Sequence, residues 1–496
     1  MLVRRSFCRF PTPSSWISRV SPASMPLRAK VTNPAFTAPA ANMSTAPKLN
    51  KASDPQSSEP DDVLFYSHYG VRLVELNRPK KLNALNGSMA MKILPRLQEW
   101  EKSQLANVIM LSGAGTKALC AGGDVASLAL QNEQGPKGQK ASADFFKLEY
   151  ILDHFIATYR KPIISVMDGI TMGGGVGLSV HAPFRIATER TVFAMPETSI
   201  GFFPDVGASF FLPRLDGQLG TYLALTGQQM HGVQTLLAGI ATHYLDSSVL
   251  SLLTARLSEL VFGDHASRAQ RLDLVNRTIA EFSSKLPPAE EQVRTYNGGI
   301  RQAIDRCFKF DTVEEIMQAL EKETESTGWA RKTLEQLSTR SPTSLKVALR
   351  QMRLGQSWSI SEAFQREHHM ATLFMSHPDF VEGVKTKLIS KSGKPVWQPA
   401  TLAEIASKDV DRFFTYFKGE EPLELLSERD YQEYPYNYGL PSEKDIKEFL
   451  SNQNDPESDV FKNFLRRFGG KPGVREKMAD VMTRKVHQGP EGKTWS

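Results

Sequence analysis

A short apolar strand, a glycine-rich turn and a helix follow one another twice in this chain, and this pattern most restricts its fold. The segment NVIMLSGAG, residues 107–115, has the apolar run of a buried strand and ends in a glycine turn. The segment KPIISVMDGITMGGG, residues 161–175, has the same form and leads into the run VGLSV. Alternating strands and helices predict an α/β fold, in which ligands bind beyond the strand ends.

The remaining segments predict how the chain is organised around this unit. Two strand-like runs flank Tyr69 and Gly70, and a helical pattern follows in which Pro95 should kink or shorten the helix. Farther on, Ser341 and Pro342 give a strong helix start. Four tyrosines after residue 430 are predicted to dock on a surface. The expected regions are a leader and linker (1–61), an α/β core (62–260), a helical C-terminal part (261–418) and an appended C-terminal extension (419–496).

Length and composition limit the class of protein. With 496 residues, of which 41% are hydrophobic, the chain can bury a full core and form more than one domain. No apolar run reaches the roughly 18 residues of a membrane-spanning helix, so we expect no membrane insertion. The three cysteines show neither CxxC nor Cys/His spacing. We therefore expect free thiols and no metal site.

The basic charge of the chain is concentrated at its N-terminus. Eight of the 60 Lys and Arg residues precede the first acidic residue, Asp54, and the rest of the chain has fewer basic than acidic residues. This argues against a generally basic, nucleic-acid-binding surface. The leader is rich in Arg and Ser, which is the composition of a mitochondrial import peptide rather than of an ordinary tail. The sequence therefore predicts a protein of the mitochondrial matrix.

The glycines of GITMGGGVG, residues 169–177, do not form a nucleotide-binding motif. A dinucleotide fingerprint that starts at Gly173 requires glycine at 178, which is Leu, and a P-loop that starts at Gly169 requires Lys at 175, which is Gly. The stretch remains a glycine turn at a helix start, where free N–H groups and the helix dipole favour negative charge. Such a turn lets a substrate approach the backbone closely.

A second glycine turn, LCAGGDVASL, covers residues 119–128 and also follows a strand. Two N–H donors from separate loops meet the requirement of an oxyanion hole, which binds an acyl oxygen as it gains charge. Asp124 comes directly after the second glycine of this turn, and we expect it to cap the next helix. His181 and Cys120 have no partners that suggest catalysis, so we expect both to serve packing.

Several ordered motifs together resemble the enoyl-CoA hydratase/isomerase, or crotonase, superfamily. Within it, they are most similar to the branch that hydrolyses 3-hydroxyacyl-CoA thioesters. The resemblance covers residues 62–418 and implies a crotonase-like (ClpP/crotonase) spiral core of repeated ββα units. The motifs are LNRPKKLNALN, ALCAGGDV, KPIISVMDGITMGGGVGLSVHAPFRIAT, FAMPETSIGFFPDVGASFFLPRL, LALTGQQMHGVQTLLAGIATHYLD, SPTSLKVALRQM and HPDFVEGVKTKLISKSGKPVWQPATL.

The resemblance assigns roles to residues of these motifs. It places the oxyanion N–H groups on Gly123 and Gly174, and it places a catalytic carboxylate on Glu197 of MPET. The hydratases of the superfamily carry a second glutamate at the position of Gly177 here, so the pair of carboxylates that hydrates a double bond is missing. The hydrolase pattern instead implies an acid eight residues after Glu197, which is Asp205.

A further glutamate of the hydrolase pattern corresponds to Glu149 in FFKLEY, so the implied substrate-contacting set is Glu149, Gly174, Glu197 and Asp205. We expect Glu197 to attack the thioester or to act as a general base on water, and Asp205 to hold the substrate hydroxyl or the water and to keep Glu197 ionised. Repulsion between the two should raise one pKa toward the working pH.

The resemblance also implies substrate and partners. The expected substrate is 3-hydroxyisobutyryl-CoA of valine breakdown, with CoA as part of the substrate and no separate cofactor. Self-association is a further expectation, because crotonase relatives often form trimers. Relatives of this family also occur in the small subunit of the fungal mitochondrial ribosome, so a structural role is an alternative that does not exclude the enzyme. Hydration or isomerisation of enoyl-CoA is the third alternative.

Overall fold

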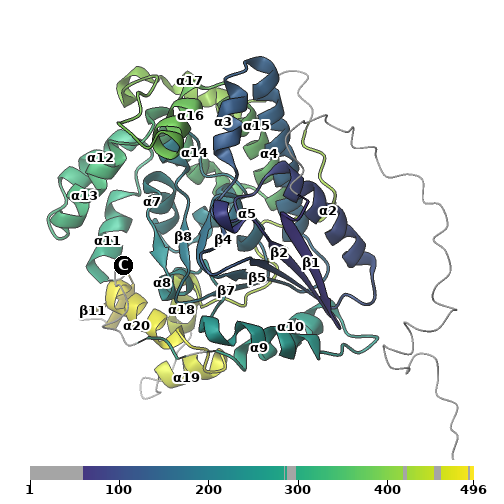
Figure 1. Cartoon of the computed structure of the whole chain (residues 1–496). Helices are drawn as coiled ribbons and strands as arrows, with labels where there is room; N and C mark the ends of the chain where they lie inside the picture. Colours follow the sequence, from purple (N-terminus) through teal and green to yellow (C-terminus); the bar gives the residue numbers. More distant parts are fainter. Residues whose placement is uncertain are drawn as a thin grey trace, which may run out of the picture. The chain divides into compact units, whose positions relative to one another are not determined.

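Consecutive strands of the core form pairs, and the two members of each pair belong to different sheets (Figure 1). The computed structural model describes residues 60–283, 285–287, 298–416, 422–451, 460–489 and 492–495. The predicted leader at residues 1–59 lies outside them. The pairs are β3 (Val108–Gly113) with β4 (Ala118–Cys120), β5 (Ile163–Met167) with β6 (Ile170–Met172), and β7 (Phe184–Ala187) with β8 (Val192–Ala194).

The first strand of each pair lies in a six-stranded sheet of order β1-β2-β3-β5-β7-β10, and the second lies in a four-stranded sheet of order β4-β6-β8-β9. The strands β3, β5 and β7 are parallel neighbours in the first sheet, and β4, β6 and β8 are parallel neighbours in the second. Each pair of strands therefore repeats the arrangement of the pair before it, and the chain advances as a spiral. This confirms the predicted ββα core. The remaining strands are β1 (Val63–His68), β2 (Val71–Leu76), β9 (Met230–His231), β10 (His243–Tyr244), β11 (Val486–Gly489) and β12 (Gly492–Trp495).

Helices surround the two sheets. None of the helices that the structure describes is both long and apolar enough to cross a lipid bilayer. They are α2 (Gly87–Lys102), α3 (Val125–Asn132), α4 (Pro136–Ala157), α5 (Gly174–Val180), α6 (Ala208–Phe211), α7 (Leu219–Thr226), α8 (Val233–Leu237), α9 (Leu250–Ser258), α10 (Arg268–Ala280), α11 (Gly298–Cys307), α12 (Val313–Glu321), α13 (Thr327–Leu337), α14 (Pro342–Leu354), α15 (Ile360–Met375), α16 (Pro378–Val384), α17 (Ser407–Asp411), α18 (Glu443–Ser451), α19 (Val460–Arg467) and α20 (Val474–Lys485).

The inner parallel strands β3, β5 and β7 of the large sheet are buried on both faces, as is usual for parallel strands. On β3, Val108 and Met110 belong to one hydrophobic cluster, together with residues of α9 and α10. Ile109 and Leu111 belong to the other cluster, which includes residues of α2, α4 and α5. The apolar run of this strand follows from its position, because neither set of alternating side chains faces water.

Of the two expected effects of Pro95 on α2, the shortening does not occur and the kink stays a prediction. Pro95 lies inside this helix but does not end it, since the helix continues to Lys102. Asn86 caps its N-terminus by accepting a hydrogen bond from the N–H of Met89. The burial of Met89, Ile93 and Leu97 on one face stabilises the helix through tertiary packing, which outweighs the cost of the proline.

The C-terminal extension packs against the α/β core. Phe464 and Val474 of the extension share a buried cluster with Ala187 and Tyr244 of the core. The predicted docking of the tyrosines is confirmed. They contact the core through rings and hydroxyls: Tyr434 on Phe210 (ring centroids 5.1 Å apart), Tyr438 on Phe184 (4.8 Å) and Tyr436, whose hydroxyl donates to Ala157 O (3.1 Å). The region boundaries at residues 260 and 418 stay predictions.

The start of α14 at Ser341 is confirmed, and its hydroxyl has two roles. It accepts from the N–H of Ser344 (3.1 Å) and donates to the carboxylate of Asp379 (2.6 Å). We predict that Ser341→Ala lowers the free energy of unfolding by about 2–3 kcal/mol, because a cap is lost and the buried Asp379 loses a donor. Ser359→Ala removes the cap of α15 and a hydrogen bond to the exposed carboxylate of Asp430, and it should cost about 1 kcal/mol. Equal losses in chemical denaturation of the two variants would contradict this.

Candidate active site

Two glycine loops lie side by side at the ends of neighbouring strands. Gly122 and Gly123 follow β4, and Gly173 and Gly174 follow β6, which pairs with β4 in parallel. Gly122 and Gly173 have positive φ angles of +111° and +45°, conformations that favour glycine. A Cβ atom at Gly174 would lie only 3.3 Å from the backbone nitrogen of Gly123, so the two loops touch.

The backbone leaves an N–H group of each loop free of regular pairing. In the bridge between Leu85 and Gly123, Leu85 donates to Gly122 O (2.8 Å) and accepts from Asp124 N (2.7 Å), so the N–H of Gly123 takes no part in it. Gly174 is the first residue of α5, where an N–H has no partner within the helix. The structure thus brings together the two predicted donors, and their catalytic role stays a prediction.

Asp124 holds the first loop by an ion pair and not by capping. It occupies the position before α3, but its side chain makes no capping hydrogen bond, so the expected cap is wrong. Its carboxylate instead pairs with Arg78 (2.9 Å) and Lys81 (3.1 Å). Arg78 also donates to Ala84 O (2.6 Å). The guanidinium competes successfully for the carboxylate because it is buried and needs a charged partner.

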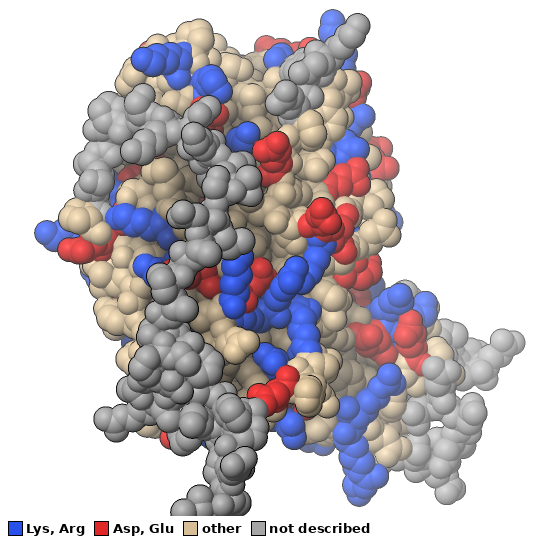
Figure 2. Space-filling view, turned by 90° about the vertical axis from the view of Figure 1, so that its right-hand side faces the viewer, with Lys and Arg blue, Asp and Glu red and all other residues tan. Residues whose placement is uncertain are grey.

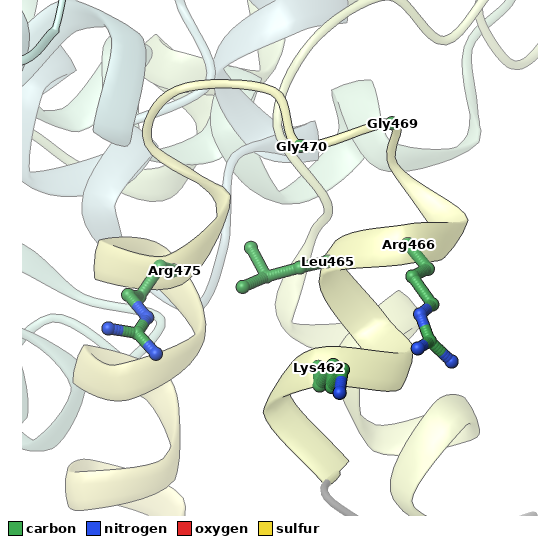
Figure 3. A pocket seen from close by; sticks show the side chains of 6 residues that line it. All are labelled: Lys462, Leu465, Arg466, Gly469, Gly470 and Arg475. Carbon is green, nitrogen blue, oxygen red and sulfur yellow. The ribbon is translucent and has the colours of Figure 1, made fainter.

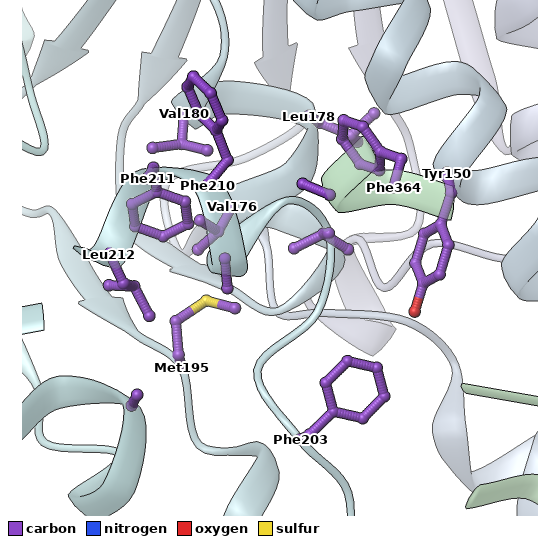
Figure 4. Close-up of a cluster of buried hydrophobic side chains, with 14 of the residues drawn as sticks. Tyr150, Val176, Leu178, Val180, Met195, Phe203, Phe210, Phe211, Leu212 and Phe364 are labelled. Carbon is purple, nitrogen blue, oxygen red and sulfur yellow. The ribbon is translucent and has the colours of Figure 1, made fainter. Parts of the chain in front are cut away.

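The second loop continues into α5, which lies in the centre of the core. Figure 4 shows Val176, Leu178 and Val180 of this helix among aromatic side chains that include Phe210, Phe211 and Phe364. All residues of α5 are buried. Dense packing around α5 fixes the position of its first residue, Gly174.

Two glutamates reach these glycines from different elements. Glu197 begins the 3-10 helix η4 (Glu197–Ile200) after β8, and its Oε1 lies 3.1 Å from the place of a Cβ at Gly173. Glu149 lies in α4, and its Oε1 lies 2.3 Å from the place of a Cβ at Gly174. Any side chain at Gly174 would displace this carboxylate. The predicted residues Glu149, Gly174 and Glu197 therefore meet in one place.

Asp205, in the loop before α6, completes this group. The hydroxyl of Tyr150 donates to its Oδ2 (2.7 Å). Burial raises the pKa of Asp205 to about 7, and the Tyr150 hydrogen bond keeps it from rising further. Burial also raises the pKa of Glu197 and of Glu149, and the charge of Asp205 raises both further. The pKa of Asp205 is thus raised toward neutral pH, as expected. The expectation that Asp205 keeps Glu197 ionised is wrong for the protein without substrate, because like charges in a buried site oppose each other.

The loop that carries Asp205 is strained and firmly held. Val206 has a φ of +54°, which is rare for a β-branched residue. Glu367 of α15 accepts from the N–H groups of Gly207 (2.6 Å) and Ser209 (2.9 Å) and from the Ser209 hydroxyl (2.5 Å). Burial raises the pKa of Glu367 to about 8, against the lowering effect of these bonds. Sequence reasoning missed Glu367, although a glutamate on the buried face of an amphipathic helix was a detectable signal.

His181, the residue directly after α5, supports the same loop. Its Nε2 lies 2.9 Å from Val206 O and its Nδ1 lies 3.2 Å from the hydroxyl of Tyr434. Burial lowers the pKa of His181 to about 4, so the ring is neutral and can donate to the carbonyl while it accepts from the tyrosine. The predicted packing role of His181 is confirmed. Through Tyr434, the C-terminal extension reaches the loop of Asp205.

Comparison with known proteins agrees with the fold and with these motifs. The family described as enoyl-CoA hydratase/isomerase matches residues 71–414. The chain belongs to the enoyl-CoA hydratase/isomerase family. The crystal structure of a carnitinyl-CoA dehydratase from Mycobacterium thermoresistibile is 34% identical with a TM-score of 0.63, and the match covers 74% of this chain and 100% of that one.

Two relatives differ in what their names say. The small ribosomal subunit protein mS47 of Neurospora crassa is 52% identical over 477 residues, which cover 94% of this chain and 92% of that protein. The mitochondrial 3-hydroxyisobutyryl-CoA hydrolase of Danio rerio is 43% identical over 354 residues, which cover 71% of this chain and 89% of that enzyme. The resemblance inferred from the motifs, including its hydrolase branch, is confirmed.

The raised pKa of Asp205 predicts how stability depends on pH. An unfolded aspartate titrates near pH ~3.9, whereas Asp205 in the folded chain titrates at about 7, so the folded state binds this proton more tightly and loses stability as pH rises between these values. Asp205→Asn should therefore match the wild type near pH 4 and be more stable at pH 8, by an amount on the order of a few kcal/mol.

Asp216→Asn serves as a control of opposite sign. Although burial by itself raises the pKa of Asp216, its ion pair with Lys477 (2.5 Å) lowers it overall. The substitution should therefore lower stability at neutral pH and lose this effect in acid. Chemical denaturation of both variants at several pH values measures the difference, and an equal change for Asp205→Asn at pH 4 and pH 8 would contradict the prediction.

Proposed function

We propose that this protein hydrolyses the thioester of 3-hydroxyisobutyryl-CoA to 3-hydroxyisobutyrate and CoA, in the mitochondrial matrix and as a step of valine breakdown. The observation that carries the proposal is the burial of Glu197 beside the glycine loops, where the charge of Asp205 acts on it, while Gly177 stands where hydratases have their second glutamate. Similarity to the zebrafish hydrolase and the import-like leader support it.

In this reaction the thioester oxygen accepts hydrogen bonds from Gly123 N–H and Gly174 N–H. A pair of such donors contributes several kcal/mol when the oxygen becomes negative, because the bonds strengthen as charge develops. The C–S bond breaks to release CoA as a thiolate, which leaves readily. The acyl carbon takes its new oxygen from water. CoA is part of the substrate, and we propose no separate cofactor.

Glu197 is the carboxyl that acts on the carbonyl carbon, as nucleophile or as general base for water. Its carboxylate lies beside the oxyanion loop, and its proton must leave before it acts. Asp205 ionises near neutral pH and is the nearby acceptor for this proton, which the leaving thiolate takes up at the end. Asp205 also holds the substrate hydroxyl. Glu149, against Gly174, orients the acyl group.

Thiol release from 3-hydroxyisobutyryl-CoA tests the proposal. We predict that Glu197→Gln lowers kcat/KM at least about 100-fold, since the amide can neither attack nor accept a proton. Glu335→Gln, an exposed position of α13, is the control and should leave the activity unchanged. Full activity of Glu197→Gln, or no thiol release by the wild type, would contradict the proposal. Hydration of crotonyl-CoA without thiol release would favour the hydratase alternative.

We also propose a second role, as a component of the mitochondrial small ribosomal subunit. Similarity to the Neurospora ribosomal protein over 94% of this chain supports it, since a match of that length includes most of the C-terminal extension. The extension contains a basic hollow of about 600 Å³, lined by Lys462 and Arg466 of α19, Arg475 of α20 and the turn at Gly469 and Gly470 (Figure 3). Such a surface suits the phosphates of RNA.

The basic hollow differs from the other basic surface of the molecule. Figure 2 shows Lys and Arg gathered on the side where α2 lies, with Asp and Glu among them. There, Arg96 pairs with Glu99 (2.8 Å) and Lys92 pairs with Asp62 (2.6 Å). Among the described residues, those that line the hollow are three cations, one leucine and two glycines.

Reversing the charge of the hollow tests the second role. We predict that the triple change Lys462→Glu, Arg466→Glu and Arg475→Glu lowers co-sedimentation with mitochondrial small subunits about tenfold or more, because each lost phosphate contact weakens binding. The control reverses three exposed cations elsewhere: Lys322, directly after α12, and Arg331 and Lys332 of α13. Equal co-sedimentation of the two triple variants would contradict the role of the hollow. Neither variant should affect thiol release.

A further inference from the structure

Two carboxylates of α4 pack against two glycines of α5. Glu149 and Asp153 are four residues apart, so they lie on one face of α4, one turn from each other. Glu149 Oε1 lies 2.3 Å from the place of a Cβ at Gly174, and Asp153 Oδ2 lies 2.3 Å from the place of a Cβ at Gly177. The two glycines are also about one turn apart on α5. The helices therefore meet through two matched contacts of carboxylate and glycine.

Asp153 is an unusual residue for a helix interior. It is completely buried, and neither of its carboxylate oxygens has a hydrogen-bond partner among the described residues. Aspartate is seldom fully buried without a partner, because removing its charge from water is costly. Its neighbours along α4, Leu152 and Ile156, are apolar and buried, so packing alone would favour an apolar side chain here. Stability therefore does not explain why an aspartate occupies position 153.

Gly177 supplies part of that reason. At this position the hydratases of the family have a glutamate, but here a Cβ would lie 2.3 Å from Asp153 Oδ2 and 2.7 Å from the Cβ of Val206. Both distances are too short for any side chain. The absence of a side chain at Gly177 makes room for the carboxyl group of Asp153, which comes from α4. The acid near Gly177 is therefore Asp153 of α4 and not a side chain of α5.

The groups that act on Asp153 are all acidic. They are Glu149 on its own helix, Asp205 in the loop before α6 and Glu367 on α15, and α5 has no titratable side chain. Burial raises the pKa of Asp153 well above its usual value, and the charges of these three carboxyls raise it further. At neutral pH the neutral acid is therefore the stable form, and it carries a proton that an unpartnered carboxylate oxygen nearby can accept.

We propose that Asp153 is a positioning residue of the active site, a neutral carboxylic acid that fills the space at Gly177 and holds Glu149 in place beside Gly174 by donating its proton to the free Oε1 of Glu149. The inference rests on the proposed hydrolysis, since it explains how Glu149 is set for the substrate. Ionisation of Asp153 breaks this bond and adds a negative charge near the oxygen that must become an oxyanion. Hydrolysis therefore declines at alkaline pH.

The pH profile of two substitutions tests this role. Asp153→Asn keeps a neutral donor in the same place and cannot ionise, so kcat/KM at pH 7 falls less than tenfold and its alkaline decline moves up by about one pH unit or more. Asp153→Ala removes the donor and lowers kcat/KM about 10- to 100-fold. Asp144→Asn, an exposed aspartate of the same helix, is the control and leaves the profile unchanged.

An infrared measurement on the full chain without substrate tests the proton directly. The wild type at pH 7 should show the carbonyl stretch of a protonated carboxylic acid, and Asp153→Asn should lose part of that band, whereas Asp144→Asn should not. An unchanged band in Asp153→Asn would overturn the inference whether or not the protein is a hydrolase. An unchanged alkaline decline in Asp153→Asn, or a loss as large as that of Asp153→Ala with the fold intact, would also overturn it.

Discussion

The parallel pairing of β4 with β6 is the interaction on which the candidate site depends. It places the ends of two strands next to each other, so that the loops at Gly123 and Gly174 touch. Each further group of the site is positioned relative to this contact. Glu197 follows β8, the next strand of the same sheet, and α4 brings Glu149 across the start of α5.

The site concentrates buried carboxyls where an apolar core would be more stable. Five of them, Glu149, Asp153, Glu197, Asp205 and Glu367, are buried close to the two loops. Their pKa values are all raised, first by burial. Carboxyls with raised pKa values cluster at sites of general acid and base chemistry. The protein accepts lower stability here in return for function.

The regions that follow the α/β core complete the site. Glu367, from the helical part of the chain, holds the strained loop of Asp205, and Tyr434, from the C-terminal extension, supports His181 behind the same loop. The extension is therefore linked to the loop of Asp205 through Tyr434 and His181.

The sequence by itself determined the α/β alternation and the helix start at Ser341, since periodicity and caps are readable along one chain. The resemblance of its motifs to a known family implied the ββα core and the set of Glu149, Gly174, Glu197 and Asp205. Only the tertiary structure decided that the pKa values of these carboxyls are raised, that Asp124 pairs with Arg78, and that Asp153 and Glu367 are buried near them. These outcomes depend on burial and on neighbours distant in sequence. A buried charge responds to every group around it, and that environment exists only after the helices have packed.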